Sequence, residues 1–126
     1  MKTKVHTAVR VSDLKRSVEF YAKLFEINLR VRTDDWAELE AEGAKLLLIR
    51  SEEPEQQAES GTPTFPSACY LGVETDDLDA FHSKVVALGA RCVQAPLNQK
   101  NGDRVAMYTD PDGLALQITE PEKFGL

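Results

Sequence analysis

The sequence predicts an α+β fold of two tandem βαβββ modules, whose curved mixed sheets form a barrel-like wall around a central cavity with the helices outside. Two observations lead to this prediction. The segment VRVSDL at Val9–Leu14 returns 64 positions later as VETDDL at Val73–Leu78, and each copy leads into a helical pattern. Three short strand patterns then follow each helical pattern. An internal repeat of this kind indicates the architecture before single elements are assigned.

The first module begins with an alternating, β-branched segment, Thr3–Val11, which predicts a strand. Ser12 and Asp13 then supply a helix start, because a side-chain oxygen caps free backbone amides and a carboxylate suits the positive end of the helix dipole. The helix is indicated by an apolar stripe that consists of Leu14, Ser17 or Val18, Tyr21, Leu24 and Phe25. Strands are predicted next at Asn28–Arg32, Trp36–Glu40 and Ala44–Arg50, with turns at residues 34–35 and 42–43.

Residues 51–66 separate the modules and contain three prolines, four glutamates and no apolar period, which is typical of a mobile loop or linker. The second module repeats the first, with strands predicted at Ala68–Glu74, Arg91–Ala95, Arg104–Thr109 and Leu114–Glu120, and a helix from about Asp76 to Leu88. Gly89 suits a left-handed cap at the end of that helix, and Asp110–Gly113 predicts a tight turn. We therefore expect a single domain over residues 1–126, with module one at about 3–50, the linker at 51–66 and module two at about 67–121.

One module of this kind covers only one face of its sheet with its helix and leaves the other face bare. Two modules must therefore combine so that their bare faces enclose a shared interior. Concave interiors of this kind are where small organic ligands bind.

The composition excludes several partners. A net charge of −6 and a pI near 4.9 argue against nucleic acid and anionic membrane surfaces, which both attract basic proteins. Apolar runs such as Leu46–Ile49 are far shorter than the roughly 20 residues of a membrane span. The first residues, Met1–His6, lack the apolar stretch of a signal peptide, so we expect a cytoplasmic protein.

Four stretches of the chain form a recognisable set: His6–Val11, Ser12–Leu14 leading to Phe20–Tyr21, Asp76–Ala80, and Asp110–Gly113 followed by a strand. In this combination the chain resembles the vicinal oxygen chelate superfamily over about residues 3–121. That superfamily includes glyoxalase I, extradiol dioxygenases, fosfomycin-modifying enzymes and bleomycin-binding resistance proteins. The resemblance is specific for the superfamily but not for one activity.

The resemblance implies where a metal would bind, because metal-dependent members take His, Glu or Gln ligands from the first and last strands of each module. His6 matches such a ligand, whereas Tyr70 stands where a metal-binding relative has His, and Gln117 stands where Glu is usual. Leu48 is the expected fourth position, and no residue of Leu46–Ile49 is a donor. A neutral phenol, with a pKa of about 10, binds metal poorly. We therefore expect no cofactor; a divalent metal held by His6 and Gln117 is the alternative.

The other candidates for the cavity each have two interpretations. Trp36 either stacks on a planar ligand at the cavity rim or makes packing or dimer contacts. Met107 is expected to line the cavity, where its flexible side chain suits an adaptable apolar pocket. Arg10 shares a face with His6 and either receives an anionic substrate or lies in solvent at the strand end. The expected ligand-binding cavity comprises His6, Trp36, Leu48, Tyr70, Met107 and Gln117.

Three further polar residues are predicted to lie in solvent. Glu38 and Glu40 are expected on a solvated strand face, and the alternative is that either enters the interior as a base. His82 is expected to be a solvated residue of the second helix that faces partly outward. No catalytic residue is identified.

Together these observations favour a protein that binds and sequesters a small organic molecule, as the bleomycin-binding members do. The alternative is a glyoxalase-like lyase or isomerase, or a dioxygenase, that uses a metal held by His6 and Gln117. A homodimer is expected in either case, because members of the superfamily pair through their modules and two-fold pairing is the commonest form of oligomer.

Overall fold

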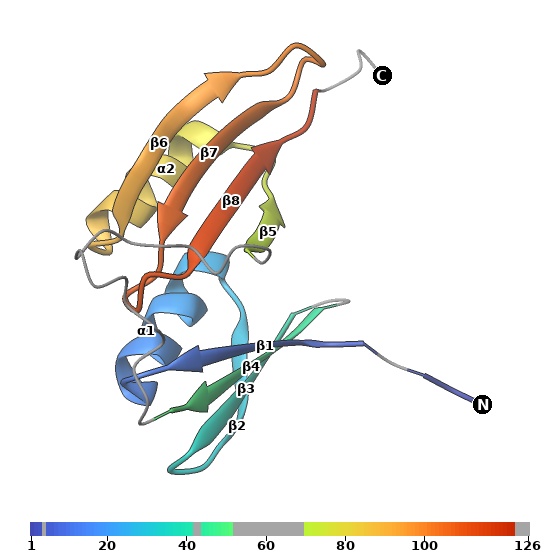
Figure 1. The fold of residues 1–126 in the computed structure, drawn as a ribbon, viewed down its shortest axis with the longest axis vertical. Coiled ribbons are helices and arrows are strands. Elements are labelled where there is room, and N and C mark those ends of the chain that lie inside the picture. The colour runs from blue at the N-terminus through green and yellow to red at the C-terminus, as the bar shows by residue number, and fades with distance from the viewer. Residues whose placement is uncertain (4, 42–43, 52–69, 123–126) are drawn as a thin grey trace. The chain divides into compact units, whose positions relative to one another are not determined.

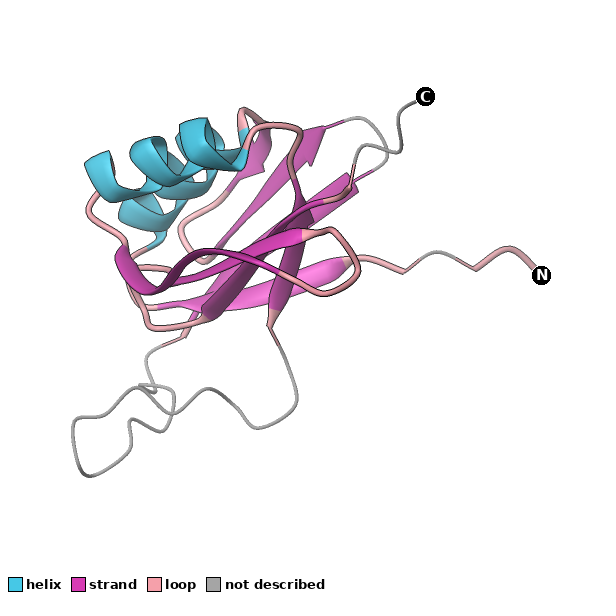
Figure 2. Cartoon of the chain, turned by 90° about the horizontal axis from the view of Figure 1, so that it is seen from above, coloured by secondary structure: helices cyan, strands magenta, loops and turns pink. Residues whose placement is uncertain are grey.

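The computed structural model of the chain describes residues 1–3, 5–41, 44–51 and 70–122. The chain forms two compact units, residues 1–57 and 58–126, and the division falls within the predicted linker 51–66. Each unit has a four-stranded mixed sheet with a helix along one of its faces among these described residues (Figure 1, Figure 2). The prediction of an α+β fold built from two βαβββ modules is thus confirmed. The predicted loop character of residues 52–66 and the turn at 42–43 lie outside the described residues.

Module one contains β1 (Thr7–Val11), α1 (Leu14–Phe25), β2 (Asn28–Arg32), β3 (Trp36–Ala41) and β4 (Ala44–Arg50). Its strand order is β1-β4-β3-β2, in which β1 is parallel to β4 and the other pairs are antiparallel. The bounds of β2 and β4 agree with the sequence prediction. The first strand is shorter than predicted, because its pairing begins at Thr7, opposite Leu46.

Helix α1 begins and ends as its sequence dictates. The Asp13 carboxylate accepts a hydrogen bond from the Arg16 amide at 3.0 Å, and Glu26 closes the helix in a left-handed conformation with φ of 56°. Such a cap is worth about 1 kcal/mol of stability. The buried face is broader than the predicted stripe, because Phe20 is also buried.

The sheet of module one has one buried and one open face. The buried face carries side chains that are at most 6% exposed, namely Val9, Val11, Ala37, Leu39, Leu46 and Leu48. Helix α1 packs on β2, β3 and β4, and its own apolar face completes this core. Because side chains alternate along a strand, the residues between them point to the opposite side of the sheet. We call that side the module-one open face; it carries Ala8, Arg10, Trp36, Glu38, Leu47 and Ile49.

Module two contains β5 (Leu71–Glu74), α2 (Leu78–Ala87), β6 (Arg91–Asn98), β7 (Arg104–Thr109) and β8 (Ala115–Glu120). The strand order is β5-β8-β7-β6, with β5 parallel to β8. Strand β6 is longer than predicted and continues through Pro96. Proline is tolerated there because β6 is an edge strand whose register shifts around Gln94.

The start of α2 is held by carboxylates from two distant parts of the module. The Asp77 side chain accepts a hydrogen bond from the Ala80 amide at 3.0 Å, and Glu120 at the end of β8 accepts one from the Leu78 amide at 2.7 Å. Asp79 forms two hydrogen bonds with the Arg104 guanidinium, at 3.0 and 3.2 Å. These contacts tie the helix to β7 and β8.

Both turns predicted in module two have the expected form. Gly89 follows α2 with φ of 83°, and Gly113 has φ of 91°, a conformation that favours glycine. The buried Asp110 side chain accepts hydrogen bonds from the amides of Asp112 at 2.9 Å and Leu114 at 2.8 Å. The Asp-Pro-Asp-Gly motif is therefore a turn that the Asp110 side chain stabilises by hydrogen bonds, and β8 begins directly after it.

Candidate functional site

The six residues predicted to line a cavity are divided equally between the two modules. His6, Trp36 and Leu48 belong to module one, whereas Tyr70, Met107 and Gln117 belong to module two. Within each module, strand register decides which side chains share a face of the sheet.

Trp36 lies on the module-one open face in a row with two other side chains. Ile49 of β4 is paired with Arg10 of β1 on one side and with Trp36 of β3 on the other. Directly paired residues in neighbouring strands point to the same face of a sheet. Arg10 is exposed, and Trp36 and Ile49 are 38% and 42% exposed, so the row presents a guanidinium, an aliphatic side chain and an indole to a ligand.

Four charged side chains form a network beside that row. Arg30 Nη1 lies 2.6 Å from Glu40 Oε2, and Arg30 Nε lies 3.5 Å from Glu38 Oε2. Lys45 Nζ lies 3.4 Å from the other oxygen of Glu38. The hydrogen bond to Glu40, together with the charges of both carboxylates, raises the pKa of Arg30 above its ordinary value. Two cations and two carboxylates therefore balance each other on this face.

The network changes the interpretation of the two glutamates. The side chain of Glu40 is 43% exposed, as expected for a solvated strand face, but that of Glu38 is only 15% exposed. Glu38 is covered because Arg30 and Lys45 reach it from neighbouring strands. The prediction that Glu38 is solvated is wrong.

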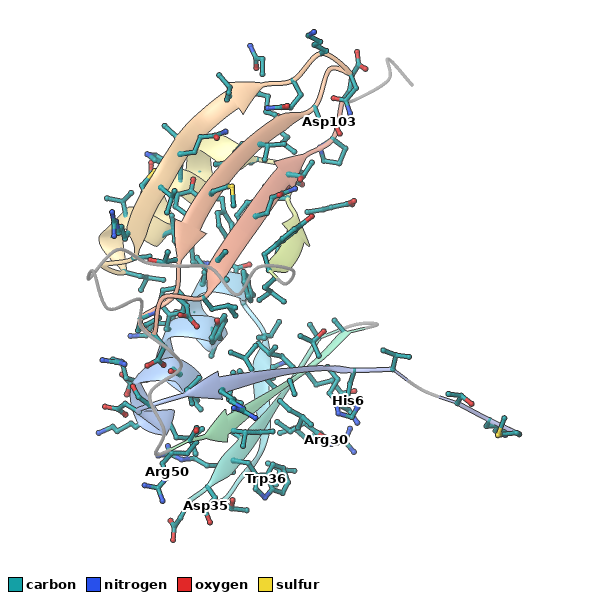
Figure 3. All side chains as sticks on the ribbon, viewed as in Figure 1. His6, Arg30, Asp35, Trp36, Arg50 and Asp103 are labelled. Atoms are coloured by element: carbon teal, nitrogen blue, oxygen red, sulfur yellow. The ribbon has the colours of Figure 1, made fainter. Side chains whose placement is uncertain are left out.

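His6 lies immediately before β1 and is exposed. Figure 3 shows its side chain on the same side of the sheet as Arg30 and Trp36, away from α1. Strand alternation, extended one residue before β1, likewise assigns His6 to the side of the sheet that carries Ala8 and Arg10.

Leu48 does not belong to this face. It is fully buried and is paired with Val9 and Ala37, which are also buried in the core against α1. A shift of one residue along a strand reverses the face to which a side chain points. The prediction that Leu48 lines the ligand cavity is therefore wrong, and Leu47 and Ile49 hold the open-face positions of β4.

The three predicted residues of module two lie together. Gln117 of β8 is paired with Gly72 of β5 and with Met107 of β7. The Tyr70 ring lies beside Gly72, with Cε2 3.6 Å from the position that a Cβ atom on this glycine would occupy. Tyr70 is 55% exposed, and Met107 and Gln117 are half-buried. We call this group the module-two open face; Gln94, paired with Met107, extends it onto β6.

His82 was missed as a structural residue. It is half-buried, and its Nδ1 atom lies 2.9 Å from the hydroxyl oxygen of Tyr108. Burial raises the pKa of Tyr108 to about 12, with smaller contributions from the charges of Cys92 and Asp79. The prediction that His82 is solvated is wrong; its spacing of four from the buried Leu78 is the signal in the sequence that indicates its position.

Among the residues predicted as metal ligands, His6 carries an imidazole, Tyr70 a phenol and Gln117 a neutral amide. Within the described parts of the chain, no three side chains of His, Cys, Asp and Glu lie close enough to hold a metal ion. On the module-one open face, β4 presents the aliphatic side chains of Leu47 and Ile49, which cannot bind a metal. A neutral amide at Gln117 and a phenol at Tyr70 are weak ligands.

None of the helices in the described residues has the length and apolar character needed to cross a membrane.

The chain is similar to known proteins both in its sequence and in its fold. The model of the Glyoxalase/Bleomycin resistance protein/Dioxygenase superfamily matches residues 4–118. Among solved structures, a bleomycin-binding protein complexed with bleomycin is 21% identical, with a TM-score of 0.66 over 96% of this chain and 100% of that chain.

Two further structures have the same fold. The fosfomycin resistance protein FosX from Listeria monocytogenes is 11% identical, with a TM-score of 0.74 over 94% of this chain and 93% of that chain. A glyoxalase/bleomycin resistance protein/dioxygenase family enzyme from Burkholderia phytofirmans PsJN is 18% identical, with a TM-score of 0.75 over 90% and 94%. At these identities the similarity establishes the fold.

Proposed function

This chain belongs to the Glyoxalase/Bleomycin resistance protein/Dioxygenase superfamily, and we propose that it binds a small organic molecule without an intact metal site. The observation that carries the proposal is the donor set. His6 is the one imidazole among the predicted ligand positions, and it is accompanied by Tyr70 and Gln117 rather than by further imidazoles or carboxylates.

The open faces supply what binding requires. Trp36 offers an indole surface, and stacking of an aromatic ligand contributes about 0.5–1.5 kcal/mol beyond the burial of area. Gln117 offers an amide that donates and accepts hydrogen bonds, and Met107 beside it adapts to the shape of an apolar group. These side chains suit recognition of an amphipathic molecule rather than activation of an oxygen atom.

Members of the superfamily differ in what they do. A structure of this fold is a bleomycin-binding protein in complex with bleomycin, which supports binding of an organic molecule, and we propose that this chain binds and sequesters its ligand. We also propose that the chain acts as a homodimer, which light scattering combined with size-exclusion chromatography would test.

A ligand screen tests the proposal. Aromatic and amphipathic compounds, bleomycin among them, are screened for a rise in melting temperature with and without EDTA. We expect the same compounds to stabilise the protein under both conditions, and His6→Ala to weaken affinity without abolishing it. Ligand binding that disappears with EDTA, together with turnover that disappears in His6→Ala, would instead support the metal-dependent lyase, isomerase or dioxygenase.

A further inference from the structure

We propose that the ligand is an aromatic organic anion, and that Arg10 receives its carboxylate while Trp36 and Ile49 hold its ring. This inference rests on the proposed function, because it names the class of molecule that the module-one open face would bind.

The row Arg10–Ile49–Trp36 has the dimensions of such a molecule. Ile49 is paired directly with both neighbours, so the three side chains stand on three adjacent strands. Neighbouring strands are about 4.8 Å apart, which places the first and last backbone positions about 10 Å from each other. An aromatic acid of two fused rings spans this distance, with its rings over Ile49 and Trp36 and its carboxylate at Arg10.

The apolar part of the row is available for contact. Trp36 and Ile49 are large apolar side chains that remain 38% and 42% exposed although they are paired with each other, at the first position of β3 and near the end of β4. Next to the row, Ala8 of β1 is exposed and is paired with Leu47 of β4. The exposed apolar surface of Trp36 and Ile49 is therefore the part of the row against which a flat ring would lie.

The charged side chains of the module-one open face indicate that the ligand is an anion rather than a cation. Arg30 and Lys45 are matched by Glu38 and Glu40 in the ion-pair network. Arg10 forms no ion pair with the residues that the structure describes, and its guanidinium is exposed. Among the described residues of this face, Arg10 is therefore the guanidinium that has no carboxylate partner, in a chain whose net charge is −6.

An unmatched guanidinium recognises a carboxylate through two parallel hydrogen bonds, because its planar fork has the geometry of the carboxylate oxygens. An amine at the same place would meet a like charge. The carboxylates of Glu38 and Glu40 do not favour an amine instead, because Arg30 and Lys45 already neutralise them. The face is thus selective for the anion.

Three probes that share one ring system test the inference by isothermal titration calorimetry: 2-naphthoate, 2-naphthalenemethanol and 2-naphthylmethylammonium. We expect the wild-type protein to bind naphthoate at least tenfold more tightly than the alcohol, and the ammonium ion least tightly. Arg10→Gln is expected to raise the Kd for naphthoate about tenfold while it leaves the Kd for the alcohol within twofold.

Arg32→Gln is the matched control. Arg32 is also an exposed arginine of module one, but it is paired with the buried Ala37 and so lies off the open face. It removes the same charge and is expected to leave all three Kd values within twofold. Melting temperatures of both variants establish that they are folded.

The outcomes separate this inference from the proposed function. Equal affinity for the three probes, or an unchanged Kd for naphthoate in Arg10→Gln, would overturn the inference while binding of the neutral alcohol still supports the proposed function. Failure of naphthoate to bind at all also overturns the inference. The ligand screen with and without EDTA then decides the proposed function by itself.

Discussion

The Nδ1 atom of His82 lies 2.9 Å from the hydroxyl oxygen of Tyr108, which joins α2 to β7 inside module two. The Tyr108 side chain is fully buried, and its ring also packs against Phe81 with ring centroids 6.3 Å apart. This pair belongs to the helix side of the sheet, so it supports the fold and leaves the module-two open face to Tyr70, Met107 and Gln117.

The buried Tyr108 predicts a loss of stability in alkali. Its folded pKa of about 12 exceeds the ordinary value of 10.0, so its contribution is fully present below pH 10 and is lost as pH rises through 12. We expect the unfolding free energy of the wild type to fall across this window by about 1–3 kcal/mol more than that of Tyr108→Phe. Urea unfolding of both proteins from pH 8 to 12 measures the difference. Parallel pH curves would contradict the assignment.

The pairing of Asp79 with Arg104 predicts a stability change in acid. The hydrogen bond from Arg104 lowers the pKa of Asp79, so the stabilisation is present above the ordinary value of 3.8 and is lost as pH falls through the lower folded value. Asp79→Asn is therefore expected to lower the melting temperature at pH 7 but not below the folded pKa. Asp34 is an exposed aspartate of module one, so Asp34→Asn is the charge-matched control. It should leave the melting temperature unchanged at both pH values. If the melting temperature of Asp79→Asn stayed below that of the wild type in strong acid as well, the loss of the ion pair would not be the cause.

The buried turn at Asp110 predicts a separate stability effect. Asp110→Ala removes the acceptor for two backbone amides, and we expect a loss of about 1–3 kcal/mol of unfolding free energy in urea titrations. Asp110→Asn retains a side-chain oxygen at the same place, so it should retain most of the stability. If both variants were equally destabilised, the charge of the carboxylate rather than its acceptor geometry would be responsible.

Leu47 and Leu48 point to opposite faces of the sheet, so their truncation is expected to reduce stability by different amounts. Leu48→Ala opens a cavity in the core against α1 and is expected to cost about 2–5 kcal/mol of unfolding free energy. Leu47→Ala truncates a half-buried side chain on the open face and is expected to cost markedly less. Chemical denaturation of the two variants compares them directly. A larger loss for Leu47→Ala would reverse the assignment of the faces.

The fold could be predicted because its signals are local. Turn residues at 34–35, 42–43 and 110–113 separate the strand segments in the sequence, and the predicted bounds of β2, β4 and β7 agree with the structure. The pattern from Thr3 also resembles a strand, but a strand exists only where it has a partner, and pairing of β1 begins at Thr7. The extent of β6 was missed because tolerance of Pro96 depends on its place at the sheet edge.

The site could be predicted only in part, because a face depends on register. Residues Leu46–Ile49 are all aliphatic, so alternation is invisible in that segment and Leu48 was assigned to the wrong side. In module two, the resemblance indicated Tyr70 and Gln117, alternation indicated Met107, and the structure pairs Gln117 with Met107 and with Gly72 beside the Tyr70 ring. His82 was missed because Tyr108, its partner, is distant in the sequence.

The metal content of the purified chain tests the account most directly. The protein is dialysed to equilibrium against micromolar Zn, Mn, Ni or Fe(II) and analysed for bound metal by elemental analysis, beside His6→Ala. The account predicts well below one equivalent of each metal, and no difference between the two proteins. Retention of one equivalent by the wild type that is lost in His6→Ala would contradict it.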